Sequence, residues 1–239
     1  MLRLSEMMIR AATAPFAAMD DILGSWGLVV LAPHPDDESL GCGGLLREAA
    51  MAGRCVAVIV VTDGRLSHPN SPSIDGDMLA QMRAAELRAA VHALHTEITV
   101  HDLGFRDCHI ADTSPAAVAA IVSVMDAVAA TALVMAWQGD PHKDHVATAA
   151  LARQAAARHG QAKLWSYPIW GRFSEYDGAV PAGIDRFDTE AHQAAKTAAI
   201  ACHRSQMTDL ITDDPQGFVM APAMQMHFIH HPEVFLADT

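Results

Sequence analysis

The chain has 239 residues, of which 51% are hydrophobic, and its formal net charge is −12. This length is enough for one large α/β domain with a substantial buried core. The negative charge argues against nucleic acid or an anionic membrane as a partner, because both attract basic surfaces. No apolar run approaches the roughly 20 residues of a membrane span. Four cysteines without CxxC spacing argue against a disulfide framework and fit a reducing cytoplasm.

The predicted elements begin with residues 1–26, which are expected to form an N-terminal helix or arm, since their scattered charges do not suit a secretory signal. From residue 27 onward, β-branched apolar runs alternate with alanine-rich segments of helical periodicity. Strands are predicted at 27–32, 55–64, 97–104, 132–137 and 163–171. Helices are predicted at 40–53, 78–95, 114–130 and 146–160, with Ser114 as an N-cap and Gly160 as a C-cap.

This alternation predicts an α/β fold, with a mostly parallel, Rossmann-like sheet covered by helices on both faces. No repeat, low-complexity tract or linker divides the chain, so residues 1–239 are expected to form a single domain. The C-terminal third is less regular. It is expected to add a helix over 190–207 and a short strand near MHFIHH, residues 226–231.

Polar clusters follow the predicted strands at their carboxyl ends. HPDDE follows the first strand, TDG the second, LGFRD the third and GDPHKDH the fourth. Because parallel strands end at one edge of the sheet, and ligands bind beyond that edge, we expect these clusters to share one site.

Two of these clusters have the spacing of metal ligands. His34 and Asp37 are three residues apart, as are His142 and His145, each pair at the start of a helix. Two histidines with one carboxylate form the ligand set of several hydrolytic zinc sites, which leave one position for water. Six candidates compete for the three places: His34, Asp36, Asp37, His142, Asp144 and His145. An alternative explanation is that Asp36 and Asp37 bind no metal and only complement the dipole at the N-terminus of a helix.

The two motifs carry a family resemblance. PHPDDE and GDPHKDH closely resemble the signatures of the PIG-L/LmbE-like N-acetylglucosaminyl deacetylases. VVTDGR, RAAE, LGFRD and KTAAIACHRSQ are similar to further landmarks of that family, so the resemblance spans roughly residues 27–210. It implies an LmbE-like fold and hydrolysis of an N-acyl group, most often acetyl, from an amino sugar.

The resemblance also implies a metal site. His34, Asp37 and His145 match the family's metal ligands, and the metal is usually zinc, although carboxylate and imidazole accept other divalent ions. Asp36 matches the general base, which takes a proton from the attacking water and later gives one to the leaving amine.

Further roles follow from the resemblance in the same way. His142 matches a protonated partner of the oxyanion, Asp107 the carboxylate that orients and charges this histidine, and Asp144 a residue that buttresses the motif. Arg83 matches an arginine that grips the substrate. The expected substrate contacts also include Asp63 and Arg65, for which a plain turn and a solvated loop remain alternatives.

Two positions depart from the family pattern. Lys143 stands where proline is commoner, and Asp140 stands where the mycothiol branch has tyrosine. The second departure makes a mycothiol-type substrate less expected.

The sequence therefore predicts a cytoplasmic zinc-dependent N-deacetylase whose partner is a small N-acylated amino sugar or glycoconjugate. A metal-dependent amidase for a non-sugar amide and a non-catalytic sugar-binding relative remain alternatives. The native ion, the glycan and the formation of a homo-oligomer stay open. A phosphorylation-dependent receiver is disfavoured, because the fifth-strand region YPIWGR lacks the lysine that it needs.

Overall fold

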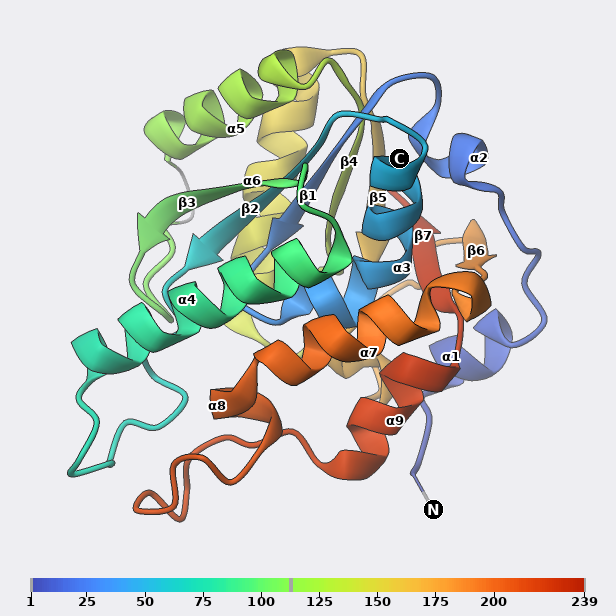
Figure 1. Cartoon of the computed structure of the whole chain (residues 1–239). Helices are drawn as coiled ribbons and strands as arrows, with labels where there is room; N and C mark the ends of the chain where they lie inside the picture. The colour runs from blue at the N-terminus through green and yellow to red at the C-terminus, as the bar shows by residue number, and fades with distance from the viewer. Residues whose placement is uncertain (1, 112–113, 239) are drawn as a thin grey trace.

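The computed structural model describes residues 2–111 and 114–238, so both ends of the predicted 1–239 domain, residues 1 and 239, lie outside it. Its centre is a seven-stranded sheet with the order β3-β2-β1-β4-β5-β7-β6 (Figure 1). The strands are β1 (Gly27–Ala32), β2 (Val56–Thr62), β3 (Thr99–Phe105), β4 (Ala130–Ala136), β5 (Lys163–Tyr167), β6 (Ile184–Phe187) and β7 (Glu233–Ala237).

Helices connect and cover the strands. The α-helices are α1 (Glu6–Ala11), α2 (Met19–Leu23), α3 (Asp37–Met51), α4 (Gly76–Leu94), α5 (Pro115–Ala127), α6 (Lys143–His159), α7 (Gln193–Cys202), α8 (Arg204–Met207) and α9 (Pro222–His230). Two short 3₁₀ helices are η1 (Trp170–Arg172) and η2 (Glu190–His192). Helices α3, α4 and α7 pack on one face of the sheet, and α5 and α6 pack on the other (Figure 1).

The central strands are buried along their whole length because helices cover both faces. Every residue of β1 and β2 is buried. In β1, Leu28 and Val30 belong to the core beneath α3 and α4, whereas Val29 and Leu31 belong to the core beneath α5 and α6. This alternation explains why the sequence shows a continuous apolar run instead of a period of two.

The predicted helix caps are confirmed. Ser114 accepts a hydrogen bond from the backbone N–H of Ala117 at the start of α5. Gly160 ends α6 in the left-handed conformation, with φ 79°. The N-terminal segment contains the short helices α1 and α2, and the side chain of Ser5 caps α1.

The C-terminal third differs from the prediction. The segment near MHFIHH is not a strand, because Pro222 starts α9 and the helix runs through His230. The strand follows directly as β7, which pairs antiparallel with both β5 and β6. The helix predicted over 190–207 is divided into η2, α7 and α8, with His203 at the break between the last two.

Within residues 2–111 and 114–238, no helix has the length and apolarity that a bilayer crossing demands.

Candidate functional site

The site lies where the chain reverses direction across the sheet. Strand β1 lies between β2 and β4 and pairs parallel with both. The connection from β1 to α3 carries His34 and Asp36, and the connection from β4 to α6 carries His142. Both connections leave the carboxyl ends of neighbouring strands, at the switch point where open α/β sheets bind ligands.

The predicted metal ligands come together at this edge. Oδ2 of Asp37 lies 3.4 Å from Nδ1 of His34 and 3.5 Å from Nε2 of His145. Asp37 is the first residue of α3, and its carboxylate also accepts the backbone N–H of His34. The turn into α3 therefore positions one carboxylate between two imidazoles from different strand ends.

A carboxylate contacts the other ring nitrogen of each histidine. Oδ2 of Asp144 lies 3.1 Å from Nε2 of His34, and Oδ2 of Asp140 lies 2.8 Å from Nδ1 of His145. Such contacts fix the ring orientation and the tautomer of metal-binding histidines. The Nε2 atom of His145 is buried and has no hydrogen-bond partner among the described residues. The arrangement therefore fits a divalent ion such as zinc, which binds imidazole and carboxylate.

Two other groupings of donors overlap this one. His34, His142 and His145 offer ligand atoms that lie within 4.8 Å of one another, and so do His34, Asp107 and Asp144. The second grouping has a different explanation, since Asp107 and Asp144 both contact Nε2 of His34. Although burial lowers it, these two carboxylates and Asp37 raise the pKa of His34 well above its usual value.

Asp36 lies beside the donors in an unusual backbone conformation. Its φ is 136° and its ψ is −30°, in a region that a non-glycine residue rarely adopts. Its Oδ2 lies 3.2 Å from Nη2 of Arg83. Burial, together with the charge of Asp37, raises the pKa of Asp36 to about 6 against the opposing effect of Arg83. The carboxylate is therefore ionised at neutral pH and ready to accept a proton.

His142 caps the N-terminus of α6. Its Nδ1 accepts the backbone N–H of Asp144, so a neutral ring carries its proton on Nε2. Burial and the neighbouring rings of His34 and His145 lower the pKa of His142 to about 4. The protonated histidine that the resemblance implies at this position is thus a neutral donor in this environment.

Asp107 faces His34 instead of His142. Its Oδ1 lies 3.4 Å from Nε2 of His34, and its Oδ2 accepts the backbone N–H of Leu66. The contact with His34 and the hydrogen bond from Leu66 lower the pKa of Asp107 although burial raises it.

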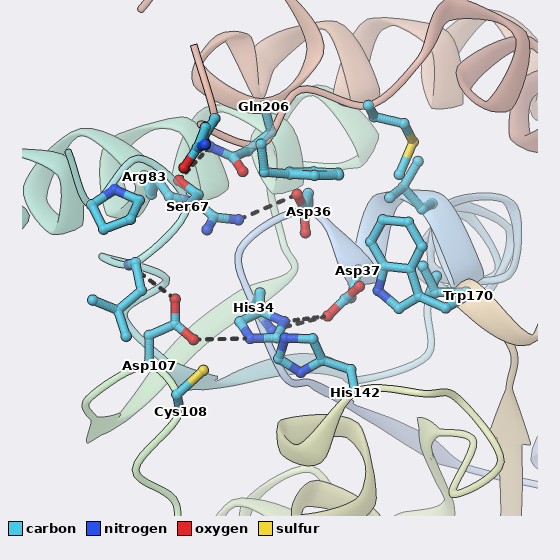
Figure 2. Close-up of a pocket in the computed structure, with 17 residues that line it drawn as sticks. His34, Asp36, Asp37, Ser67, Arg83, Asp107, Cys108, His142, Trp170 and Gln206 are labelled. Atoms are coloured by element: carbon cyan, nitrogen blue, oxygen red, sulfur yellow. Dashed lines mark hydrogen bonds and ion pairs between the residues drawn. The ribbon is translucent and has the colours of Figure 1, made fainter. Parts of the chain in front are cut away.

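A pocket of about 320 Å³ opens over these groups (Figure 2). Its polar side includes Asp36, Asp107 and His142; in Figure 2, Asp107 points toward His34 and Asp36 toward Arg83. Its apolar lining residues come from α3, the loop after β2, the segment after β5 and the C-terminal segment: Leu40, Leu66, Pro69, Ile169, Trp170, Phe218 and Met220. The rings of Trp170 and Phe218 form an edge-to-face pair with centroids 5.4 Å apart.

The residues predicted to contact the substrate form hydrogen bonds and ion pairs with other groups of the protein. Arg83 is buried, and it donates to the carbonyl oxygens of Gly64 and Pro35 as well as approaching Asp36. Arg65 pairs with Asp63 and Asp77 and, like Asp63, is not among the residues that line the pocket.

Asp140 belongs to this site although the sequence marks it only as the position where tyrosine is absent. Both of its oxygens accept hydrogen bonds. They accept the backbone N–H groups of Ile169 and Gly171 as well as the ring N–H of His145. An acidic residue five positions before a candidate ligand, in the loop that leads to it, was the available signal.

Comparison with known proteins identifies the family. Residues 29–156, more than half of the chain, match the family described as PIG-L: GlcNAc-PI de-N-acetylase. The chain therefore belongs to the PIG-L family. A 1D-myo-inositol 2-acetamido-2-deoxy-alpha-D-glucopyranoside deacetylase from Kineococcus radiotolerans is 37% identical over 95 residues. That match covers 36% of this chain and 26% of the relative, so the chain spans about a quarter of the relative's length.

Solved structures share the fold. N,N'-diacetylchitobiose deacetylase from Pyrococcus horikoshii superposes with a TM-score of 0.67 at 20% identity, over 89% of this chain and 83% of that one. A 4-carboxy-2-hydroxymuconate hydratase from Pseudomonas putida superposes with a TM-score of 0.63 at 17% identity, over 76% and 80%. The fold thus occurs with more than one chemistry, so the fold alone does not define the reaction.

Proposed function

We propose that this protein is a zinc-dependent hydrolase that removes an N-acyl group, most often acetyl, from an amino sugar or its conjugate. The observation that carries the proposal is the approach of His34 Nδ1 and His145 Nε2 to one oxygen of Asp37. Asp140 and Asp144, which contact the opposite ring nitrogens, leave these two atoms free for an ion. Membership in a family described by de-N-acetylation supports the same reaction.

The proposed ligands of the ion are His34, Asp37 and His145. A zinc ion bound there supplies a Lewis acid, which lowers the pKa of water and polarises a carbonyl oxygen. The pKa of Asp37 lies below its usual value because His145 and His34 outweigh the effect of burial, so its carboxylate is available as a ligand.

Asp36 is the proposed general base. Its pKa of about 6 lies close to neutral pH, where a base has both the right protonation state and a useful driving force. It takes the proton from the attacking water and returns a proton to the nitrogen of the leaving amine. Arg83 limits the directions that the carboxylate can take, because it contacts both Asp36 and the preceding carbonyl of Pro35.

His142 is the proposed hydrogen-bond donor to the developing oxyanion. Because its Nδ1 accepts from the backbone of Asp144, the Nε2–H group is the one left to donate to the substrate. A neutral imidazole can stabilise an oxyanion in this way without first gaining a proton.

The substrate class is inferred from the pocket and the relatives. Trp170 and Phe218 present an apolar surface of the kind on which a sugar ring packs. The deacetylases that this chain resembles are named for N-acetylated amino sugars. An N-acetylated amino sugar, free or conjugated, is therefore the proposed substrate.

The test is acetate release from a panel of N-acetylated amino sugars and, as a comparison, amides without a sugar, with and without a chelator. We expect chelator-sensitive release from the sugars by the wild-type protein. Asp36→Asn is expected to lose most of the turnover and to keep its zinc. Release from the non-sugar amides alone would instead support an amidase, and full turnover by Asp36→Asn would remove Asp36 as the base.

A further inference from the structure

The backbone at Asp36 must be held in place by its surroundings. A φ of 136° is unfavourable for a residue with a side chain, and such conformations persist only where neighbouring contacts stabilise them. Asp36 directly precedes the first residue of α3, so its backbone sets the direction of its carboxylate. The contacts that hold this backbone therefore affect the position of the proposed base.

The first contact comes from Glu38. This side chain is fully buried, and its Oε2 accepts the backbone N–H of Asp36 at 3.0 Å. Its Oε1 accepts from the hydroxyl of Ser39 and lies 2.9 Å from Nε2 of His203. A buried carboxylate needs such partners, because an unpaired charge away from water is costly.

His203 reaches this carboxylate from a distant part of the chain. It lies at the break between α7 and α8, 165 residues away from Glu38, and it is fully buried. The break between α7 and α8 therefore places Nε2 of His203 beside the Glu38 carboxylate, which accepts the backbone N–H of Asp36.

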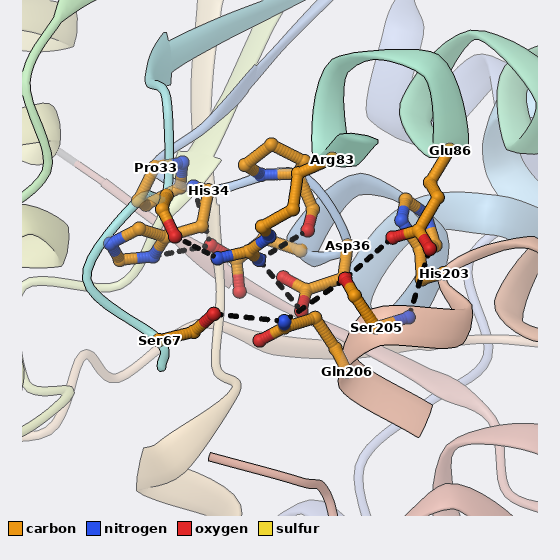
Figure 3. Close-up of polar contacts among 12 residues, drawn as sticks. Pro33, His34, Asp36, Ser67, Arg83, Glu86, His203, Ser205 and Gln206 are labelled. Carbon is orange, nitrogen blue, oxygen red and sulfur yellow. Dashed lines mark hydrogen bonds and ion pairs between the residues drawn. The ribbon is translucent and has the colours of Figure 1, made fainter. Parts of the chain in front are cut away.

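A second branch holds the side chain of Asp36. Arg83 in α4 donates to the carbonyl of Pro35 and approaches Oδ2 of Asp36. One turn later in α4, Glu86 accepts both the backbone N–H and the hydroxyl of Ser205 in α8 (Figure 3). The segment that contains His203 is thus tied to both helices that position Asp36.

We propose that His203 is a positioning residue that acts through Glu38 to hold the strained backbone of Asp36 and so aim its carboxylate. The inference rests on the proposed function, in which Asp36 is the general base. His203 does not line the pocket and takes no part in the proton transfer itself. Misplacement of a catalytic group by about 1 Å costs about a hundredfold in rate, so the loss of this contact affects turnover more than substrate binding.

The chain contains a matched control. His192 contacts Glu48 at 3.1 Å and so also joins α3 to the segment that precedes α7. This pair lies ten residues further along α3 than Glu38, well away from Asp36. His192→Ala therefore removes a histidine–glutamate contact between α3 and the opposite end of α7 without touching the proposed base.

The test compares kcat and KM for acetate release in a double-mutant cycle. We expect His203→Ala to lower kcat about ten- to hundredfold with little change in KM and zinc content, as substitutions behind a functional group do. His203→Gln, which keeps a donor toward Glu38, is expected to recover most of the loss. In the Asp36→Asn background, His203→Ala is expected to lower the residual rate less than twofold. Equal losses in both backgrounds, or an equal loss in His192→Ala, would overturn the proposal.

A second measurement does not depend on activity. Hydrogen exchange of the Asp36 amide, followed by NMR, is expected to speed up at least tenfold in His203→Ala and to stay unchanged in His192→Ala. Unchanged exchange in His203→Ala would refute the positioning role even if the protein were active. Faster exchange in a protein that releases no acetate would support the positioning role while the proposed function failed.

Discussion

Asp140 and Asp144 orient the rings of His145 and His34 in the candidate metal site. Each carboxylate occupies one ring nitrogen and leaves the other beside Asp37. The sequence places the histidines at suitable spacing, but spacing alone does not say which nitrogen is free. That choice depends on a contact between loops, which only the structure supplies.

A first prediction concerns Asp140. Asp140→Asn weakens the hydrogen bond to Nδ1 of His145 and removes the negative charge next to this ring. We expect zinc affinity to fall about 10- to 100-fold, as for other residues that orient a metal ligand. Competition with a chromophoric chelator measures the effect. Asp126→Asn, at an exposed carboxylate beside His159, is the control and should bind zinc as the wild type does. Unaltered affinity in Asp140→Asn would contradict the role of this carboxylate.

A second prediction concerns the buried His227. Burial and the nearby charge of Arg172 lower the pKa of this residue to about 3, so the folded protein keeps it neutral. In the unfolded chain its pKa is about 6.5, and below that pH the unfolded state alone gains a proton. Its contribution to the free energy of unfolding therefore falls by about 2 kcal/mol between pH 7 and pH 5.

Urea unfolding of wild-type protein and of His227→Gln, at both pH values, measures this contribution. The loss of stability between pH 7 and pH 5 should be smaller in the variant by about 2 kcal/mol. His101→Gln, at an exposed position of β3, should lose as much as the wild type. If His227→Gln and the wild type lost the same amount, His227 would not be neutral in the folded state.

At the scale of elements, α3 contains three glycines, Gly41, Gly43 and Gly44, toward its middle. Glycine in a helix costs about 1 kcal/mol relative to alanine, so their presence needs a reason. A Cβ on Gly41 would lie 2.2 Å from the ring of Tyr167, and one on Gly44 would lie 2.4 Å from Thr189. The glycines let α3 approach β5 and the segment after β6 closely, and this approach places Asp36 and Asp37 over the sheet.

The third prediction tests this packing. In Gly41→Ala, the buried ring of Tyr167 must move, and its hydrogen bond to the carbonyl of Leu31 is disturbed. We expect the free energy of unfolding to fall by about 1–3 kcal/mol, as in other overpacked cores. Gly43→Ala is the matched control, because the nearest atom that its Cβ would meet is Cγ of Lys196 at 3.2 Å, a much milder contact than the one at Gly41. Thermal unfolding of both variants measures this difference in stability. Equal stability of the two would show that α3 does not need this close approach.

The C-terminal elements α9 and β7 could not be predicted from the local sequence pattern. The sequence predicts a short strand near MHFIHH, but Pro222 starts a helix that runs through His230, and the strand β7 begins only at Glu233. The sheet also accepts β7 as an antiparallel partner of β5, a pairing between segments about 70 residues apart. Patterns within a few residues do not reveal such a pairing.

At the scale of the whole molecule, the sequence predicted the sheet, its helices and the edge at which the site lies. Those features follow from local periodicity and from the rule that parallel strands end together. The environment of Arg83 was not predictable in the same way, because its guanidinium binds main-chain carbonyls from two separate turns. The contact between Glu38 and His203 likewise joins residues that only the tertiary fold brings together.

The most direct measurement is the titration of metal-free protein with zinc by calorimetry, for wild type and three variants. We expect the wild type and His142→Ala to bind one zinc per chain. Asp37→Ala and His145→Ala are expected to remain unloaded at zinc concentrations that saturate the wild type. Loss of binding in His142→Ala with retention in Asp37→Ala would move the site to the three histidines. Absence of binding in the wild type would contradict the proposal that His34, Asp37 and His145 hold a metal.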